Sequence, residues 1–495
     1  MTYPVRYDSS SAPKLGAVFN ATGAFSQKGK ELQEQRFQRL FERLLKEGAI
    51  HRDSMLAPRI FGPHEAMRVA DEFAAARVDV MLICNSAFPN GHVFPTIALH
   101  PQLSRTPLIL TADAEPELGD SEWTTNAWCG VIMNNYVAKR LGRRVRPLPG
   151  NPDSERYCDE LRMLLNCSRA IALLRRDLLG RFGDAPGGFH SATMDQFVFL
   201  HTFGTQQENV DLLSLIETYR SGKATGLCGE ASFSEAEAEA TTQEMRAGRS
   251  CHISEEHLRR GARLYHALRA QVQANGFTSV AVKCWPELLA KDLKIAACFP
   301  MTWLMTKGDV WSASCESDTA TAVMQSLAAL LTGRPAACLD FVNYTGHSSC
   351  VELGHCGVGI AGLMGDDEAI AYKSPDRQGG EPDHAPALIG QFAYGPKTGL
   401  AITQTPDGEL KVLTFTGESN PETALHKQYS AADVLVEEFR ELNEMILEHG
   451  FAHHLAVAMA DITLEVKEVC AFLGVCCVSP GTARVRGHRT RELGA

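Results

Sequence analysis

The segment Cys315-Glu316-Ser317-Asp318 is the stretch of the sequence whose residue types point most clearly to chemistry. It directly precedes residues 320–331, whose apolar side chains recur at helical spacing. Asp318 is therefore expected to cap that helix. Acids at a helix N-terminus stabilise it by ~0.3–1 kcal/mol and need no further role. Glu316, two positions earlier, has no such local role, which favours it as a site residue.

A second acid, Asp340, ends the short apolar run Cys338-Leu339. In α/β sheets, ligands collect beyond the carboxyl ends of the strands, so an acid there is well placed for function. The structural alternative is equally open, since an aspartate at that point can cap the following loop.

Histidines follow at His347, at His355 and at the adjacent pair His453-His454, which the pattern places at the entrance of a final helix over 454–473. A lone histidine is more often structural. Carboxylates and imidazoles together, however, are the ligand set of a divalent metal, and the oxygen ligands favour Mn²⁺ or Mg²⁺. Spacing alone does not bring Glu316, Asp340 and the histidine pair together, because only the fold can do so.

Two other patterns are weak signals. Cys356 lies beside His355, but thiol catalysis needs a base in contact and a lowered thiol pKa, which sequence does not show. The glycine-rich turn Gly183–Gly188 lacks the lysine of a phosphate loop, and no GxGxxG fingerprint is present. Nucleotide binding is therefore disfavoured.

The elements that would position these residues alternate between short apolar strands and amphipathic helices up to about residue 333. Beyond that point, β-rich runs flank the turn Pro406-Asp407-Gly408, which indicates an antiparallel region. The sequence thus predicts an α/β protein with two doubly wound parallel-sheet domains followed by a smaller β-rich antiparallel C-terminal domain. The expected boundaries are 1–148, 149–333 and 334–495.

Length and composition narrow the class of protein. The chain has 495 residues, 44% hydrophobic and 22% charged, with a net charge of 48 − 59 = −11. This charge argues against nucleic acid and anionic membranes as partners. The 15 cysteines form no CxxC…CxxC spacing, and no signal peptide or membrane-length apolar segment is evident. A cytoplasmic location is expected.

Taken in order, these segments resemble the L-fucose isomerase and L-arabinose isomerase family of metal-dependent aldose–ketose isomerases. The resemblance covers most of the chain. The resemblance rests on residues 282–288, 315–318 and 331–335, on Asp340 shortly after them, on residues 355–357, and on the terminal pair His453-His454. No single motif is decisive, but their order and spacing are fairly specific.

The resemblance implies that Glu316, Asp340 and one of His453 or His454 hold the metal, with His454 slightly preferred. It makes His355 the counterpart of an additional histidine in the arabinose branch, where it would meet the substrate. It also implies Mn²⁺, or another divalent metal such as Mg²⁺ or Co²⁺, and a homo-oligomer, either trimer or hexamer. Trp285 is a candidate platform for the sugar face, with core packing as the alternative.

The function that this resemblance implies is the interconversion of an aldose and the matching ketose through a metal-stabilised cis-enediol. Glu316 and Asp340 would act as base and acid on a small-molecule monosaccharide. A metal-dependent epimerase or lyase acting on a sugar or sugar derivative is the first alternative, since a fold does not fix its reaction. A non-catalytic sugar-binding protein is the second, although it would need neither acid.

Overall fold

The computed structural model describes residues 12–115, 125–288, 293–344, 349–365, 370–374, 386–420 and 429–481. His347 lies outside these ranges. The described chain divides into two compact units. The N-terminal unit comprises residues 12–173 and 465–474, and the C-terminal unit comprises the described residues of 174–464 and 475–481.

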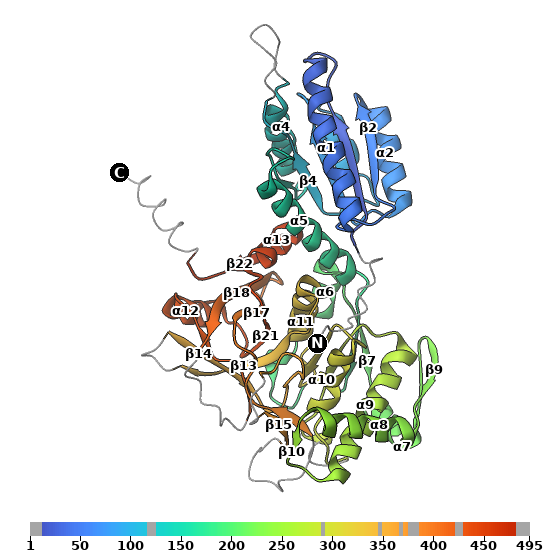
Figure 1. Ribbon diagram of the computed structural model, residues 1–495, viewed down its shortest axis with the longest axis vertical. Helices are drawn as coiled ribbons and strands as arrows, with labels where there is room; N and C mark the ends of the chain where they lie inside the picture. The colour runs from blue at the N-terminus through green and yellow to red at the C-terminus, as the bar shows by residue number, and fades with distance from the viewer. Residues whose placement is uncertain are drawn as a thin grey trace. The chain divides into compact units, whose positions relative to one another are not determined.

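The N-terminal unit contains a five-stranded, fully parallel sheet of order β2-β1-β3-β4-β5. Strands β1 and β3 are buried at every position, as expected for a parallel sheet covered on both faces. Figure 1 shows the helices of this unit packed around the strands. Its elements are β1 (Leu15–Asn20), α1 (Gln27–Glu47), β2 (Met55–Ile60), α2 (Pro63–Ala76), β3 (Val80–Asn85), α3 (Val93–Ala98), β4 (Leu108–Thr111), α4 (Ala127–Arg140), β5 (Arg146–Pro147) and α5 (Glu155–Leu174).

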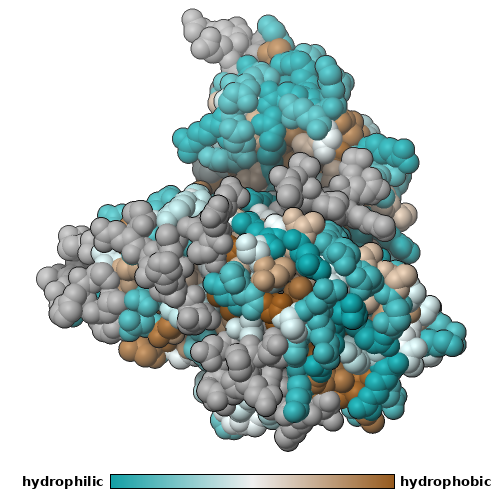
Figure 2. Space-filling model, turned by 60° about the horizontal axis from the view of Figure 1, so that its bottom comes forward, coloured by the Kyte–Doolittle hydropathy of each residue, from teal (hydrophilic) through white to brown (hydrophobic). Residues whose placement is uncertain are grey.

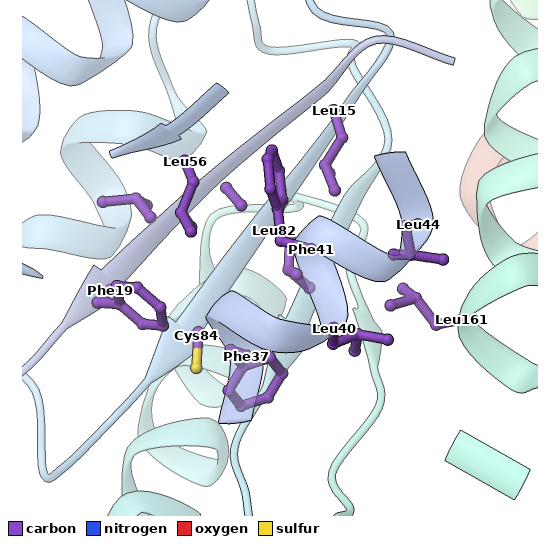
Figure 3. A pocket seen from close by; sticks show the side chains of 12 residues that line it. Leu15, Phe19, Phe37, Leu40, Phe41, Leu44, Leu56, Leu82, Cys84 and Leu161 are labelled. Atoms are coloured by element: carbon purple, nitrogen blue, oxygen red, sulfur yellow. The ribbon is translucent and has the colours of Figure 1, made fainter. Parts of the chain in front are cut away.

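A late helix, α13 (Thr463–Leu473), completes this unit. The Arg146 guanidinium donates to Glu468 Oε1 at 2.6 Å, and the Cys167 thiol donates to the Glu465 carbonyl at 3.5 Å. Figure 3 shows the apolar space between α1 and the sheet, which is lined by side chains such as Phe19, Phe37 and Leu161. Its volume is about 10 Å³, room for one water at most, so it is packed core rather than a ligand pocket.

The C-terminal unit begins with a four-stranded parallel sheet of order β12-β11-β6-β7. Its strands are β6 (Leu178–Phe182), β7 (Gln206–Val210), β11 (Ser279–Val282) and β12 (Ser312–Cys315). The helices of the unit are α6 (Gln196–Thr202), α7 (Leu212–Ser221), α8 (Glu235–Gly248), α9 (Glu255–Asn275), α10 (Cys298–Lys307), α11 (Thr319–Thr332) and α12 (Phe439–His449), with a 3₁₀ turn, η2, at His190–Ala192.

Six further strands of this unit form antiparallel pairings that close on themselves in the order β13-β21-β17-β18-β20-β14 and back to β13. Figure 1 shows these strands, gold to red, curving around one another. The closed set is β13 (Ala337–Tyr344), β14 (Cys350–His355), β17 (Pro396–Gln404), β18 (Leu410–Ser419), β20 (Val434–Leu435) and β21 (His454–Ala458). Two short strands pair with this closed set, β19 (Ser430–Ala431) and β22 (Cys476–Val478). A separate three-stranded sheet contains β10 (Ser250–Cys251), β15 (Ala371–Lys373) and β16 (Ala387–Ile389). The hairpin consists of β8 (Lys223–Gly226) and β9 (Gly229–Ser232).

The predicted fold class is confirmed in outline, with parallel sheets first and an antiparallel sheet towards the C-terminus. The division into units differs from the expected boundaries at 148 and 333. Helix α5 stays with the N-terminal unit, and one hydrophobic core joins the parallel sheet to the antiparallel one, for example through Val282, Ala337 and Leu455.

The predicted final helix over 454–473 is wrong in its first half. His454–Ala458 is a fully buried strand in the closed sheet, and the helix begins only at Thr463. The apolar run Leu455–Ala458 is compatible with either structure, and pairing with β13 and β17 decides it. Asp340, expected at a strand end, lies within β13.

On the face drawn in Figure 2, hydrophilic side chains cover most of the described surface, and apolar side chains gather in limited patches. None of the described helices is both long and apolar enough to span a bilayer.

Asp177, just before β6, gives the first testable prediction. Burial raises its pKa to about 6, although the Thr278 and Ser279 hydroxyls donate to its Oδ1 at 2.7 and 2.6 Å. An unfolded aspartate titrates near 3.9, so the folded state binds more protons between these values and stability falls as pH rises through that window. Asp177→Asn keeps an acceptor and cannot ionise.

We expect Asp177→Asn to stabilise the fold by up to about 3 kcal/mol at pH 8 and by about half of that at pH 5. Thermal unfolding of both proteins across this range measures the difference. A variant that melts below the wild type at pH 8 would contradict the prediction.

Candidate metal centre

A tight turn directly after β12 carries Glu316 and sets the direction of its side chain. The amide of Asp318 donates to the Cys315 carbonyl at 3.0 Å, and both central residues, Glu316 (φ 57°) and Ser317 (φ 55°), adopt left-handed backbone. Such conformations are strained for residues other than glycine and cluster at functional sites. The Ser317 hydroxyl donates to the carbonyls of Phe182 and Gly183 at 3.0 and 3.1 Å, which holds the turn against the end of β6, the second strand from β12 in the sheet.

Asp318 caps α11, as predicted, and also binds a histidine. Its Oδ1 accepts from the Thr321 amide at 3.0 Å, and its Oδ2 lies 2.9 Å from His454 Nδ1. Sequence analysis missed the second contact, because His454 is 136 residues away and reaches Asp318 only through the strand β21. A hydrogen bond on one ring nitrogen fixes the orientation of the imidazole and directs the other nitrogen elsewhere.

The other nitrogen of His454, Nε2, faces two further carboxylates. It lies 3.3 Å from Glu316 Oε2 and 3.2 Å from Asp340 Oδ1. Asp340 is brought there because it pairs with His454 in register between β13 and β21. Glu316, Asp318 and His454 are each at most 3% exposed and the Asp340 side chain is 26% exposed, so three carboxylates meet one imidazole in a largely buried space.

His355 and His453 complete the cluster. Ligand atoms of Asp340, His355 and His454 all lie within 4.8 Å of one another, as do those of Glu316, His453 and His454, and those of Cys315, Glu316 and His355. His355 is buried at the end of β14 and His453 is exposed. The structure therefore brings together all the residues that the sequence predicts for the metal.

The pKa values in this cluster reflect mutual stabilisation of charge. Burial acts to lower the pKa of His454, but its hydrogen bonds to the carboxylates of Asp318, Asp340 and Glu316 outweigh burial and hold the pKa well above its ordinary value. Burial likewise opposes ionisation of Asp318 and Asp340. Hydrogen bonding to His454 nevertheless leaves the pKa of both carboxyls below the usual range.

Trp285, the candidate sugar platform, lies near this cluster. Phe189 connects it to His453, with ring centroids 6.3 Å from Trp285 and 6.1 Å from His453. The Ser191 hydroxyl lies 3.3 Å from His453 Nδ1. Trp285 is half-buried. Phe189 and Ser191 come from the loop and 3₁₀ turn after β6, and sequence analysis did not name either of them as a site residue.

A polar pocket of about 540 Å³ opens at the carboxyl ends of β6, β7 and β11. Its lining includes Arg181, Asn209 and Lys283. The Arg181 Nε donates to the Ser317 carbonyl at 3.4 Å, which places the pocket next to the turn that carries Glu316.

The chain is similar to two curated bacterial proteins. One, from Alkalicoccus urumqiensis, is 24% identical over 366 residues, which cover 73% of this chain and 78% of that protein. The other, from Clostridium sp. (strain MSTE9), is 23% identical over 375 residues, covering 74% and 79%. Both are named sulfoquinovose isomerase. The resemblance drawn from sequence is thus supported at the level of sugar isomerases, whereas fucose and arabinose are not the sugars in these names.

Comparisons with protein-family models and with solved structures assign no family to the chain. No protein-family model matches the chain. A solute-binding protein of an ABC transporter from Burkholderia multivorans is matched over 66% of this chain and 95% of that one, with 11% identity and a TM-score of 0.18. A TM-score this low does not indicate a shared fold.

Replacement of Asp318 tests whether this residue does more than cap α11. Asparagine caps helices about as well as aspartate, so Asp318→Asn should leave the melting temperature nearly unchanged. It removes the charge that faces His454 Nδ1, and loss of such a supporting partner typically weakens metal binding 10–100-fold. Thermal unfolding and Mn²⁺ titration of the variant separate the two effects. Unchanged Mn²⁺ affinity would restrict Asp318 to capping.

Proposed function

We propose that this chain is a divalent-metal-dependent aldose–ketose isomerase. The observation that carries the proposal is the meeting of the carboxylates of Glu316, Asp318 and Asp340 on the two ring nitrogens of His454. Even with His454 protonated, three carboxylates and one imidazolium sum to −2 in a largely buried space. Buried charge is costly unless it is compensated, and a divalent cation would supply the compensation.

An unpartnered buried atom supports the same interpretation. His355 Nε2 is buried and has no hydrogen-bond partner within the described residues. A bound ion is one recognised explanation for a buried polar atom without a partner. Glu316, Asp340 and His454 would hold the ion, with His355 and His453 as the adjacent imidazoles. Oxygen and imidazole ligands suit Mn²⁺, with Mg²⁺ or Co²⁺ as alternatives.

The chemistry asked of the site is the transfer of a proton between C1 and C2 of an open-chain sugar. When bound, the ion supplies Lewis acidity towards the substrate oxygens. Glu316 and Asp340 supply the base and the acid that remove the proton from one carbon and return one to the other through a cis-enediol. General acid–base groups of this kind each contribute about 10²–10⁴ in rate. Trp285 and Phe189 offer an apolar wall for the sugar face.

The two relatives suggest which sugar to test first. Both carry the name of sulfoquinovose, a sulfonated aldose, so this compound heads the panel of substrates. The cations of the 540 Å³ pocket, Arg181 and Lys283, are paired with Asp184 and Glu287. The homo-oligomeric state and the cytoplasmic location remain part of this proposal.

A substrate screen tests the proposal. Protein loaded with Mn²⁺ and protein dialysed against EDTA are incubated with sulfoquinovose, L-fucose, L-arabinose and other aldoses, and products are identified by NMR. We expect a ketose from at least one aldose, and only with the loaded protein. A C2 epimer or a cleaved carbon chain would instead favour the epimerase or lyase, which could use the same groups. Full activity after exhaustive EDTA dialysis would contradict the metal requirement.

A further inference from the structure

The segment Gly354-His355-Cys356-Gly357 contains a thiol that contacts a candidate metal ligand. Cys356 Sγ lies 3.3 Å from His355 Nδ1, within the range of a hydrogen bond to sulfur. The opposite nitrogen, Nε2, lacks a hydrogen-bond partner among the described residues and belongs to the group formed with Asp340 and His454. His355 is only 2% exposed, so the ring sits between a thiol on one side and the cluster on the other.

A second thiol lies against the first. Cys298 Sγ, from the first turn of α10, is 3.8 Å from Cys356 Sγ. Cys298 is 1% exposed and belongs to the main hydrophobic core of the C-terminal unit. Cys356 is therefore held between a core helix and the His355 ring.

Gly354 and Gly357 flank the His355-Cys356 pair and let the backbone of this segment lie close to its neighbours. A Cβ on Gly357 would lie 2.6 Å from the Ala387 Cβ and 3.1 Å from the Cys298 Cβ. A Cβ on Gly354 would lie 2.2 Å from the Tyr429 ring. Side chains at either position would clash, so only glycine lets the His355-Cys356 pair sit at this depth. The segment is built to place these two side chains.

We propose that Cys356 is a positioning residue, which orients His355 so that its Nε2 faces Asp340 and His454 and takes part in metal binding. The inference rests on the proposed function and extends it. A ring nitrogen can bind a metal only through its lone pair, which requires the proton to reside on the other nitrogen. The Nδ1–H then donates to Cys356 Sγ, a weak acceptor, and this contact fixes both the tautomer and the ring orientation.

Equilibrium Mn²⁺ binding tests the inference without relying on turnover. Dissociation constants are measured from the EPR signal of free Mn²⁺ for the wild type, Cys356→Ser, Cys356→Ala and the control Cys350→Ala. Cys350 is a buried thiol on the same strand β14 and lies outside the cluster. We expect Cys356→Ala to weaken binding about 10-fold or more. Cys356→Ser retains a hydrogen-bonding group and should stay close to wild type, as should Cys350→Ala.

A double-mutant cycle with His355→Ala separates positioning from general packing. If Cys356 acts through His355, the effect of Cys356→Ala disappears when His355 is already absent, because the two losses are not additive. Should Cys356→Ala fail to fold, Cys356→Val fills the space of the thiol without a polar atom and takes its place in the cycle.

The outcomes are distinct. Equal Mn²⁺ affinity in the wild type and Cys356→Ala, or an undiminished loss in the His355→Ala background, would overturn the positioning role and leave the proposed function standing. Absence of Mn²⁺ binding by the wild type would instead overturn the metal requirement of the proposed function itself.

Discussion

Replacement of His454 by alanine is expected to abolish stable metal binding and to lower kcat/KM by about 10³-fold or more. His454 contacts Glu316, Asp318 and Asp340 at once. Its loss would remove one proposed ligand and leave three carboxylates facing one another in a buried space. Removing one partner from a buried charge cluster lowers the free energy of unfolding by about 3–5 kcal/mol. Elemental analysis and steady-state kinetics on the folded variant measure both effects.

His453→Ala is the matched control, because it removes an adjacent imidazole. His453 is exposed, its Nδ1 lies 3.3 Å from the Ser191 hydroxyl, and it is grouped with a single carboxylate, that of Glu316. We expect this variant to keep its metal and to change mainly the kinetics. Equal metal content in both single variants and the wild type would remove the histidine pair from the metal site. Loss of metal only from His453→Ala would reverse the assignment.

Glu316→Gln is expected to lower kcat by about 10²–10⁴-fold, the range for loss of one general acid–base group. The variant keeps the size of the side chain and its left-handed turn, but it removes the carboxylate that faces His454 Nε2 at 3.3 Å. Asp340→Asn should have an effect of the same order, since the two carboxylates share the proton transfer.

Glu352→Gln serves as the control for a general loss of negative charge, because Glu352 lies on β14, accepts a hydrogen bond from Asn343 and belongs to none of the ligand groups around His454. Its kinetics should match the wild type. Wild-type kcat in Glu316→Gln with the metal retained would show that Glu316 has no part in proton transfer.

The local parts of this structure could be predicted because they depend on neighbouring residues. Asp318 followed by apolar side chains at helical spacing defined α11 and its cap, and the Pro406-Asp407-Gly408 turn defined the β17–β18 hairpin. Glu316 was a candidate because it had no local role, and the left-handed turn at Glu316 and Ser317 is consistent with that reasoning.

The long-range parts could not be predicted because they depend on closure of the antiparallel sheet. His454 lies on a strand rather than a helix only because β21 pairs with β13 and β17. The same pairing sets Asp340 opposite His454 and lets Asp318 reach Nδ1, so Asp318 supports the histidine as well as the helix. Similarly, the contact between Cys298 and Cys356 joins residues 58 apart and has no periodicity to reveal it.

The most direct test of the central claim is isomerisation in D₂O. The metal-loaded protein is incubated with the aldose that the screen identifies, starting with sulfoquinovose, and the products are followed by NMR. Proton transfer by Glu316 and Asp340 predicts formation of the ketose together with solvent deuterium at C1 of the ketose and C2 of the recovered aldose. Both signals should be lost in Glu316→Gln. Ketose formation without any solvent deuterium, or no ketose from any aldose tested, would contradict the account.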